Sequence, residues 1–94
     1  MHFLYILYSQ KIDKYYIGES PDIVNRLEQH NSHYFKKAFT KAADDWEIAV
    51  AMELNNKCDA VYLEKFIKRM KSKTFIQKIA KNNNILLDIL NKKP

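Results

Sequence analysis

The segment Phe3–Gly18 (FLYILYSQKIDKYYIG) constrains the fold most, because it has the pattern of two short strands joined by a polar turn. Apolar side chains occupy both sets of alternating positions in the first strand, so we expect both of its faces to be covered. Symmetric pairing about the turn would place Tyr5 opposite Gly18, which has no side chain and leaves a space. Tyr5 and Tyr16 would then be diagonal neighbours on one face, about 7–8 Å apart at the backbone. A slip of one residue would put them on opposite faces.

A helix is predicted directly after this hairpin. Ser20 is a suitable N-cap, Pro21 suits the first helical position, and the helix should end near Asn31. At 3.6 residues per turn, its buried stripe consists of three apolar residues: Ile23, Val24 and Leu27.

The remaining elements complete an α/β pattern. Residues 46–53 alternate in polarity and predict a third strand, and a long helix capped by Asn55, Asn56 or Asp59 should run to about Lys71. The buried stripe of that helix would be Ala60, Leu63, Ile67 and Met70. Two shorter helices should follow, around residues 75–80 and 85–90. We expect one domain over residues 1–94, with a small three-stranded antiparallel or mixed sheet flanked by helices in the order β-β-α-β-α-α.

The charge is concentrated in the C-terminal part of the chain. Residues 57–94 hold ten of the 16 Lys and Arg residues but three of the 11 Asp and Glu residues. A basic half on a small protein favours a polyanionic partner such as nucleic acid, although a solvated lysine surface would look the same. Cys58 is the single cysteine, which argues against a disulfide framework and favours a cytoplasmic location. No stretch resembles a signal peptide or a membrane span, so no membrane partner is expected.

The segment of residues 32–45 has mixed character and is expected to be a loop. Its aromatic residues Tyr34 and Phe35 stand beside three lysines: Lys36, Lys37 and Lys41. Such a mixture can hold a nucleic-acid strand, and it also suits a surface loop with aromatic anchors.

Five side chains are candidates for chemistry: Tyr5, Tyr16, Arg26, His30 and Glu64. Arg26 and His30 are four residues apart on one edge of the first helix, and Glu64 lies at the edge of the long helix's stripe. Arginine binds phosphate oxygens through two donors, and one carboxylate with waters can hold Mg²⁺. A phenol acting as a base at neutral pH would need its pKa lowered by about 3 units, or about 4 kcal/mol. A metal-bound water reduces that demand.

Each of these residues also has a purely structural interpretation. Tyr5 and Tyr16 taken singly are typical sheet aromatics, and a lone carboxylate such as Glu64 is usually salt-bridged. Arg26 would be a surface charge, and His30 a cation favoured at a helix C-terminus. The functional interpretation rests on all five residue types occurring on one side of a sheet.

The sequence resembles the GIY-YIG endonucleases. Phe3-Leu4-Tyr5 and Tyr15-Tyr16-Ile17-Gly18 match the paired signature of the family, with Phe3-Leu4 in place of its Gly-Ile. The similarity continues over about residues 3–83, through Arg26 to Asn31, Tyr34 to Lys41, Trp46-Glu47 and Leu63 to Lys68. It is strongest to small stand-alone bacterial members, whose domain is similar to the N-terminal domain of excision-repair nucleases.

The resemblance implies a metal-dependent DNA endonuclease, with a role in repair or recombination. By that resemblance Tyr5 is the general base, Tyr16 places water or phosphate, and Arg26 stabilises the transition state. His30 would assist phosphate binding or proton relay, and Glu64 would bind one Mg²⁺ or Mn²⁺. A further family asparagine is not placed, since Asn82 to Asn84 match it loosely. A protein partner is expected to supply specificity.

Two other functions remain open on the sequence. One is a non-catalytic nucleic-acid-binding module whose nuclease site has decayed or depends on a partner, and it predicts salt-sensitive binding without cleavage. The other is a protein-interaction adaptor, which predicts no DNA affinity at physiological salt.

Overall fold

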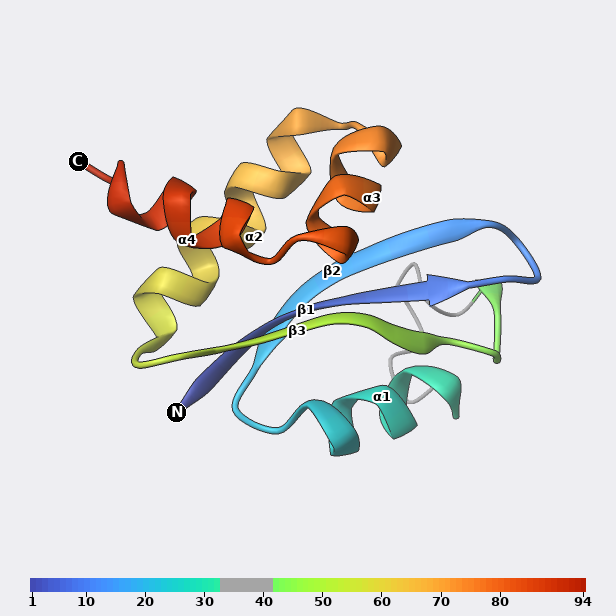
Figure 1. Ribbon diagram of the computed structural model, residues 1–94. Coiled ribbons are helices and arrows are strands. Elements are labelled where there is room, and N and C mark those ends of the chain that lie inside the picture. Colours follow the sequence, from blue (N-terminus) through green and yellow to red (C-terminus); the bar gives the residue numbers. More distant parts are fainter. Residues whose placement is uncertain (33–41) are drawn as a thin grey trace.

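The computed structural model describes residues 1–32 and 42–94, which form three strands and four helices (Figure 1). In chain order the elements are β1 (His2–Ser9), β2 (Lys14–Ser20), α1 (Ile23–Asn31), β3 (Glu47–Leu54), α2 (Lys57–Met70), α3 (Lys73–Lys81) and α4 (Asn84–Asn91). This order confirms the predicted α/β class, and both strand pairings are antiparallel. No helix among the described residues is long and apolar enough to cross a membrane.

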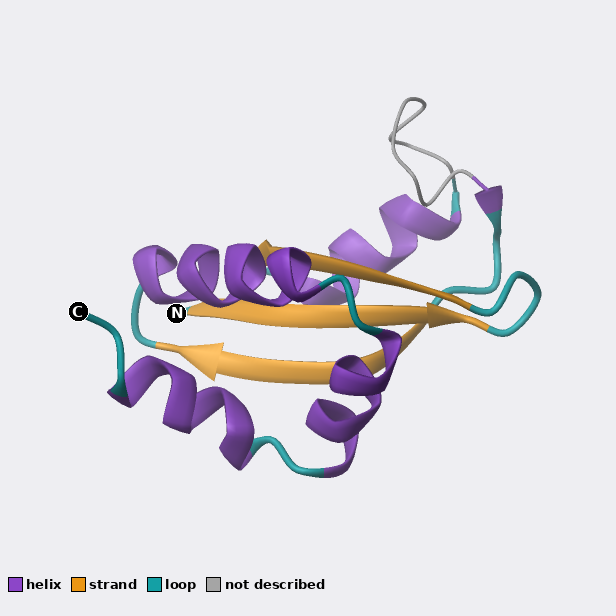
Figure 2. Ribbon diagram, turned by 90° about the horizontal axis from the view of Figure 1, so that it is seen from above, coloured by secondary structure: helices purple, strands orange, loops and turns teal. Residues whose placement is uncertain are grey.

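The sheet has the order β2-β1-β3, so the N-terminal strand lies in its centre (Figure 2). Tyr5 pairs with Gly18 and Leu7 pairs with Tyr16, which is the register that the symmetric hairpin predicts. The pairing of β1 with β3 shifts between Ile6 and Leu7. β1 pairs with a strand along each of its edges, and the register of these pairings fixes the face on which each hairpin side chain lies.

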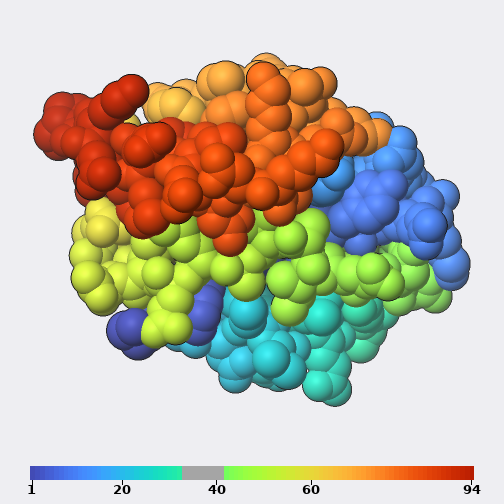
Figure 3. All heavy atoms as spheres, in the orientation of Figure 1, coloured from blue at the N-terminus to red at the C-terminus, as the bar shows by residue number. Residues whose placement is uncertain are grey.

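Helices cover both faces of the sheet, as the apolar pattern of the first strand predicts. α1 lies against one face, and α2, α3 and α4 lie against the other, with the strands visible between them (Figures 1 and 3). The larger core joins Leu4 and Ile6 to the buried residues of α2, α3 and α4, and the smaller one joins Tyr5 and Leu7 to Trp46 and Ala43. Tyr5 therefore belongs to the face under α1.

The predicted start of the first helix was wrong by two residues. Ser20 is the last residue of β2, and its hydroxyl accepts from the Asp22 backbone N–H at 3.1 Å. Asp22 is the actual N-cap, and its carboxylate accepts from Asn25 N–H at 3.0 Å. The pairing of Ser20 with Phe3 holds it in the sheet, so the helix has to begin after Pro21.

Two residues placed in buried stripes are instead exposed. Val24 is 72% exposed, because α1 contacts the sheet through a narrow seam of Ile23, Leu27 and His30. Met70 is 46% exposed, because α2 ends there and the chain turns away at Lys71. The other three residues of the α2 stripe are buried as predicted, and its N-cap is Asn56.

A side-chain clamp joins the end of α1 to the start of β3. The amide of Asn31 donates to the Trp46 carbonyl at 3.0 Å and accepts from the Trp46 N–H at 2.7 Å. Trp46 itself is 2% exposed and belongs to the smaller core, so this partly buried clamp lies at the edge of that core. The predicted nucleic-acid-binding residues of the connection, Tyr34, Phe35, Lys36, Lys37 and Lys41, lie outside the described residues.

Candidate active site

Three of the five candidate side chains form one aromatic cluster, each from a different element. Tyr5 extends from β1, Tyr16 from β2 and His30 from α1. The hydroxyl of Tyr5 lies 3.1 Å from Nε2 of His30 in a hydrogen bond. The Tyr16 ring lies 4.8 Å from the His30 ring and 6.4 Å from the Tyr5 ring, measured between centroids. The predicted juxtaposition of the two tyrosines is thus present, and the helix adds an imidazole to it.

Gly18 allows this cluster to form. A Cβ atom at this position would lie 2.5 Å from the Tyr5 hydroxyl oxygen and 2.6 Å from the ring carbon that bears it. The phenol of Tyr5 therefore lies directly over the backbone of β2, in the space that the sequence predicts. Since Gly18 has no positive φ, the requirement for glycine comes from this contact and not from the backbone conformation.

Gly18→Ala should therefore displace Tyr5 and destabilise the protein. Overpacking of this kind typically costs about 1–3 kcal/mol of unfolding free energy, because the Tyr5 ring is buried and its hydroxyl is held by His30. Urea unfolding measures the free energy, and the ¹⁵N chemical shift of His30 Nε2 reports whether the hydrogen bond persists. Wild-type values for both would show that the ring moves aside freely.

His30 is neutral at physiological pH. Its burial removes water from the imidazolium, and the positive charge of Arg26 adds to this effect, lowering the pKa of His30 to about 4. The neutral ring has one donor and one acceptor nitrogen, so it can exchange a hydrogen bond with the Tyr5 phenol in either direction. The sequence-based alternative, a helix C-terminal cation, is wrong for this residue.

The low pKa of His30 predicts a specific pH dependence of stability. Between pH 6.5 and about 4 the unfolded chain binds a proton that folded His30 does not, so stability falls as the pH is lowered through this window. From pH 7 to pH 5 this residue should reduce the unfolding free energy by about 2 kcal/mol. Urea unfolding of wild type and His30→Gln at both values isolates the effect, since the other titrating groups cancel. Equal losses in the two proteins would contradict the assignment.

Neither phenol of the cluster is ionised at neutral pH. Burial raises the pKa of Tyr5, and the neighbouring Tyr16 raises it further. Burial also raises the pKa of Tyr16, with Glu64 as the next cause. The guanidinium of Arg26 lowers the pKa of both. A phenolate at this site therefore requires a further positive charge or a proton transfer that is coupled to another step.

Arg26 and Glu64 reach the cluster from opposite layers of the molecule. Arg26 is on α1, and its positive charge lowers the pKa values of Tyr5, Tyr16 and His30. The prediction that all five candidates lie on one side of the sheet is wrong, because Glu64 is on α2, which packs on the other face. Its charge nevertheless raises the pKa of both phenols. Glu64 is therefore within electrostatic reach of the cluster, at the side of the sheet where α2 lies along β2.

The Glu64 carboxylate suits an oxygen-binding metal ion. It is 20% exposed and forms an ion pair with Lys68 at 3.4 Å, one turn along α2. Within residues 1–32 and 42–94, no group of three or more His, Cys, Asp and Glu side chains could hold a metal. A single carboxylate fits Mg²⁺, which usually keeps several waters and completes its shell with a substrate phosphate.

A second carboxylate near the cluster was missed by sequence reasoning. Glu19 directly follows Gly18, and its charge raises the pKa of both Tyr5 and Tyr16. Glu19 pairs with Leu4 across the hairpin, and its carboxylate is hydrogen-bonded to the His2 imidazole. Its position after Gly18 in the second strand is the signal that could have identified it.

Comparison with known proteins gives one finding. The family model for the GIY-YIG catalytic domain matches residues 1–80 of the 94-residue chain. Neither the curated proteins nor the solved structures contain a match.

Proposed function

The chain belongs to the GIY-YIG family of nucleases, and on that basis we propose that it is a metal-dependent endonuclease that hydrolyses phosphodiester bonds in DNA. The family supports a nuclease fold, a nucleic-acid substrate and a general dependence on divalent metal. We further propose that this chain is itself catalytic, that the five site residues carry the reaction, and that the metal is Mg²⁺ or Mn²⁺.

The observation that carries the proposal is the hydrogen bond between Tyr5 and neutral His30, beside Tyr16. A phenol with a raised pKa is a poor base by itself, because it has no charge to accept a proton. The neutral imidazole on its hydroxyl offers an acceptor for the phenol's own proton, and the negative charge of a bound phosphate would raise the low pKa of that imidazole. The phenol can accept a proton at oxygen while its own proton moves to Nε2 of His30.

We propose that hydrolysis uses this pair as a proton relay. A water oxygen forms the new bond to phosphorus, and its proton passes to Tyr5 as the Tyr5 proton passes to His30. The bond from phosphorus to the leaving oxygen breaks, that oxygen takes a proton from solvent, and His30 releases its proton to solvent and becomes neutral again. Arg26 stabilises the extra negative charge on the phosphate in the transition state, an effect of a fixed donor usually worth about 3–4 kcal/mol.

Glu64 is the residue proposed to hold the metal ion. When bound, Mg²⁺ or Mn²⁺ would acidify water and neutralise charge on the phosphate oxygens. Glu64 is suited to this because its carboxylate is partly exposed and its charge is felt at both phenols. The same charge without a metal opposes phenolate formation, so the cluster is better suited to catalysis with a cation present.

The basic C-terminal part provides the proposed affinity for DNA, since lysines on α2 and α3 can contact backbone phosphates without reading sequence. We further propose a cytoplasmic role in DNA repair or recombination, in which a protein partner supplies selectivity. We therefore expect the isolated chain to discriminate less among DNA substrates than the chain with its partner does.

A nuclease assay tests the function directly. Purified protein is incubated with linear, branched, damaged and single-stranded DNA, and with RNA, in Mg²⁺, Mn²⁺ or chelator. Metal-dependent nicking of DNA that chelator abolishes is the expected result. Salt-sensitive DNA binding without cleavage in either metal would favour the non-catalytic binding module, and no DNA affinity at physiological salt would favour an adaptor.

A further inference from the structure

An apolar groove lies between α2 and α4, on the face of the sheet away from α1 (Figure 1). Its volume is about 400 Å³. Six of its eight lining residues are aromatic or aliphatic: Tyr62, Phe66 and Met70 of α2, Phe75 of α3, and Ile85 and Ile89 of α4. Met70 is 46% exposed, so apolar surface of the groove remains in contact with water. The family-model match ends at residue 80, so the wall that α4 supplies lies outside that match.

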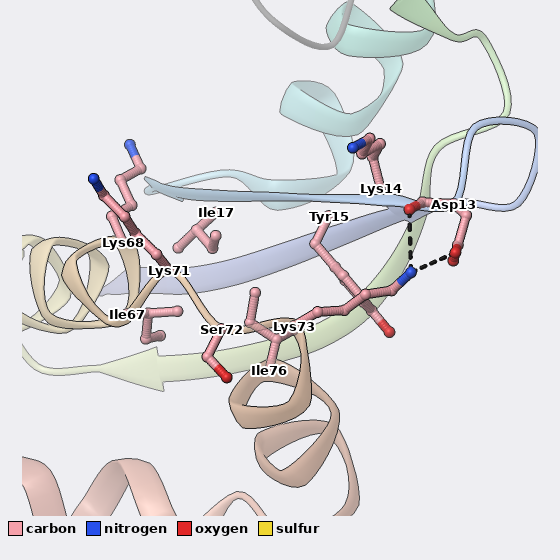
Figure 4. Close-up of a pocket in the computed structure, with 10 residues that line it drawn as sticks. All are labelled: Asp13, Lys14, Tyr15, Ile17, Ile67, Lys68, Lys71, Ser72, Lys73 and Ile76. Carbon is pink, nitrogen blue, oxygen red and sulfur yellow. Dashed lines mark hydrogen bonds and ion pairs between the residues drawn. The ribbon is translucent and has the colours of Figure 1, made fainter.

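The groove and the proposed metal ligand lie on opposite flanks of α2. With 3.6 residues per turn, Tyr62, Phe66 and Met70 follow one side of the buried stripe of this helix, and Glu64 and Lys68 follow the other. Lys68 lines a different pocket, which is bounded by β2 and the start of α3 (Figure 4). A molecule bound in the groove would therefore leave the proposed catalytic edge accessible to DNA.

Cations cover the aromatic rings at the rim of the groove. The guanidinium of Arg69 lies 5.9 Å from the centroid of the Phe66 ring, and the ammonium of Lys93 lies 5.3 Å from that of the Tyr62 ring. A nucleic-acid base could stack on these ring faces only by displacing the cations. The lining also offers few donors to a phosphate, since Lys92 is the one cation in it. These features favour apolar protein side chains over DNA as the occupant.

The charge around the groove favours an acidic partner. All of the lining residues belong to residues 57–94, which hold ten Lys and Arg residues and three Asp and Glu residues. Arg69 and Lys92 take part in none of the ion pairs found within residues 1–32 and 42–94, and Asp88 is the one acidic residue in the lining. A second copy of the chain would bring the same positive charge to the groove, which makes self-association unfavourable.

A helix fits the length of this groove. Tyr62 and Met70 are eight residues apart, which is about 12 Å along α2 and equals about two turns of a partner helix. Apolar side chains at positions i, i+4 and i+7 of such a helix cover that length. Aromatic side chains and an exposed methionine are typical of surfaces that bind amphipathic helices.

We propose that this groove binds an amphipathic helix of a partner protein, through an apolar face that is flanked by acidic residues. The inference names the chemistry of the partner in the proposed function, and it rests on that function in this respect. The groove holds the apolar side chains, and the cations at its rim lie near the acidic ones.

A displayed library of helices tests the chemistry of the partner. Each member carries apolar residues at positions i, i+4 and i+7, and each flanking polar position is Glu or Lys with equal frequency. The library is selected for binding to the full chain near physiological salt, about 0.15 M, which screens weak long-range attraction. We expect the selected helices to be rich in Glu. A synthetic peptide of the selected sequence should bind at least about tenfold more tightly than a scrambled peptide of the same composition.

Met70→Glu and Leu87→Glu form a matched pair of variants for this peptide. Both add one negative charge at an apolar position of a helix, and the wild-type side chains are 46% and 47% exposed, but Leu87 does not line the groove. Met70→Glu should weaken peptide binding by about tenfold or more, and Leu87→Glu by less than about threefold. Met70→Ala, which adds no charge, should weaken binding more than Leu87→Glu does. Thermal melting establishes that all three variants are folded.

Several outcomes would overturn the groove as a docking site. They are failure to select any helix, selection of Lys-rich helices, and equal effects of Met70→Glu and Leu87→Glu. A wild-type dimer in sedimentation that Met70→Glu dissociates would instead make the groove an interface between copies. A loss of affinity for fluorescent DNA that is confined to Met70→Glu would assign the groove to DNA.

The result is separate from that of the nuclease assay, because peptide binding is measured without DNA or metal. A chain that nicks DNA but binds no acidic helix would retain the proposed function and lose the docking site. A chain that binds the helix through Met70 but never nicks DNA would refute the nuclease proposal and leave the groove as a protein-binding site.

Discussion

Glu64→Ala is expected to abolish metal-dependent DNA nicking, with a loss of at least about 10³-fold in the single-turnover rate at saturating DNA. Glu64 supplies the one carboxylate proposed to hold the metal, so its removal leaves no protein ligand in the proposed site. The fold should be unaffected, because the Glu64 side chain lies at the edge of the buried stripe of α2. Alanine also has the highest helix propensity. Nicking is measured on a supercoiled plasmid across a series of Mg²⁺ and Mn²⁺ concentrations.

Glu28→Ala is the matched control for this variant. It removes a glutamate from an exposed position of another helix, α1, and should retain nicking at close to the wild-type rate. Melting temperatures of both variants should stay near that of the wild type. If Glu64→Ala nicks DNA at an undiminished rate, the assignment of the metal ligand is wrong.

Tyr5→Phe is expected to cause a comparable loss of nicking, because it removes the only atom through which Tyr5 can accept and pass on a proton. The ring would keep its packing, but the hydrogen bond to His30 at 3.1 Å would be lost. The buried imidazole then loses this hydrogen bond, which should reduce the unfolding free energy by about 0.5–1.5 kcal/mol. Single-turnover nicking and urea unfolding are measured on the same preparations.

Tyr8→Phe provides the control on the same strand. It also removes a phenolic hydroxyl that is hydrogen-bonded, here to Asp13 at 2.6 Å, but on the opposite face of the sheet. Its nicking rate at saturating DNA should match the wild type. Equal rates for Tyr5→Phe and Tyr8→Phe would remove Tyr5 from the reaction and leave it a structural residue.

The hairpin could be predicted in detail from the sequence. A strand has a period of two, and a short turn allows few registers, so the pairing of Tyr5 with Gly18 followed from the turn position. The side chain that Gly18 lacks left a space for the Tyr5 phenol, and the structure places that phenol within it. The same register also predicted that Tyr5 and Tyr16 lie on one face of the sheet and contact each other.

Helix limits and helix faces were less predictable, because they depend on neighbours in space. Ser20 has the chemistry of an N-cap, but its pairing with Phe3 assigns it to the sheet and leaves capping to Asp22. Val24 fits an apolar stripe by periodicity, yet α1 contacts the sheet along too narrow a seam to cover it. Local pattern alone cannot supply the width of that contact.

The neutral state of His30 and the place of Glu64 required coordinates. The low pKa of His30 results from burial under α1 against the sheet, which the helix sequence does not specify. The place of Glu64 also required coordinates, because the sequence does not show that α2 packs on the face of the sheet away from α1.

The clamp between Asn31 and Trp46 has a consequence for engineering. It holds the last residue of α1 and the residue before β3 at a fixed separation, through both hydrogen bonds of one amide. A peptide of another length could then be inserted between Ser32 and Ala43, because Ala43 belongs to the smaller core and Asp45 accepts a hydrogen bond from Ser9. The clamp thus offers a site at which a recognition module could be grafted beside the histidine-bearing helix.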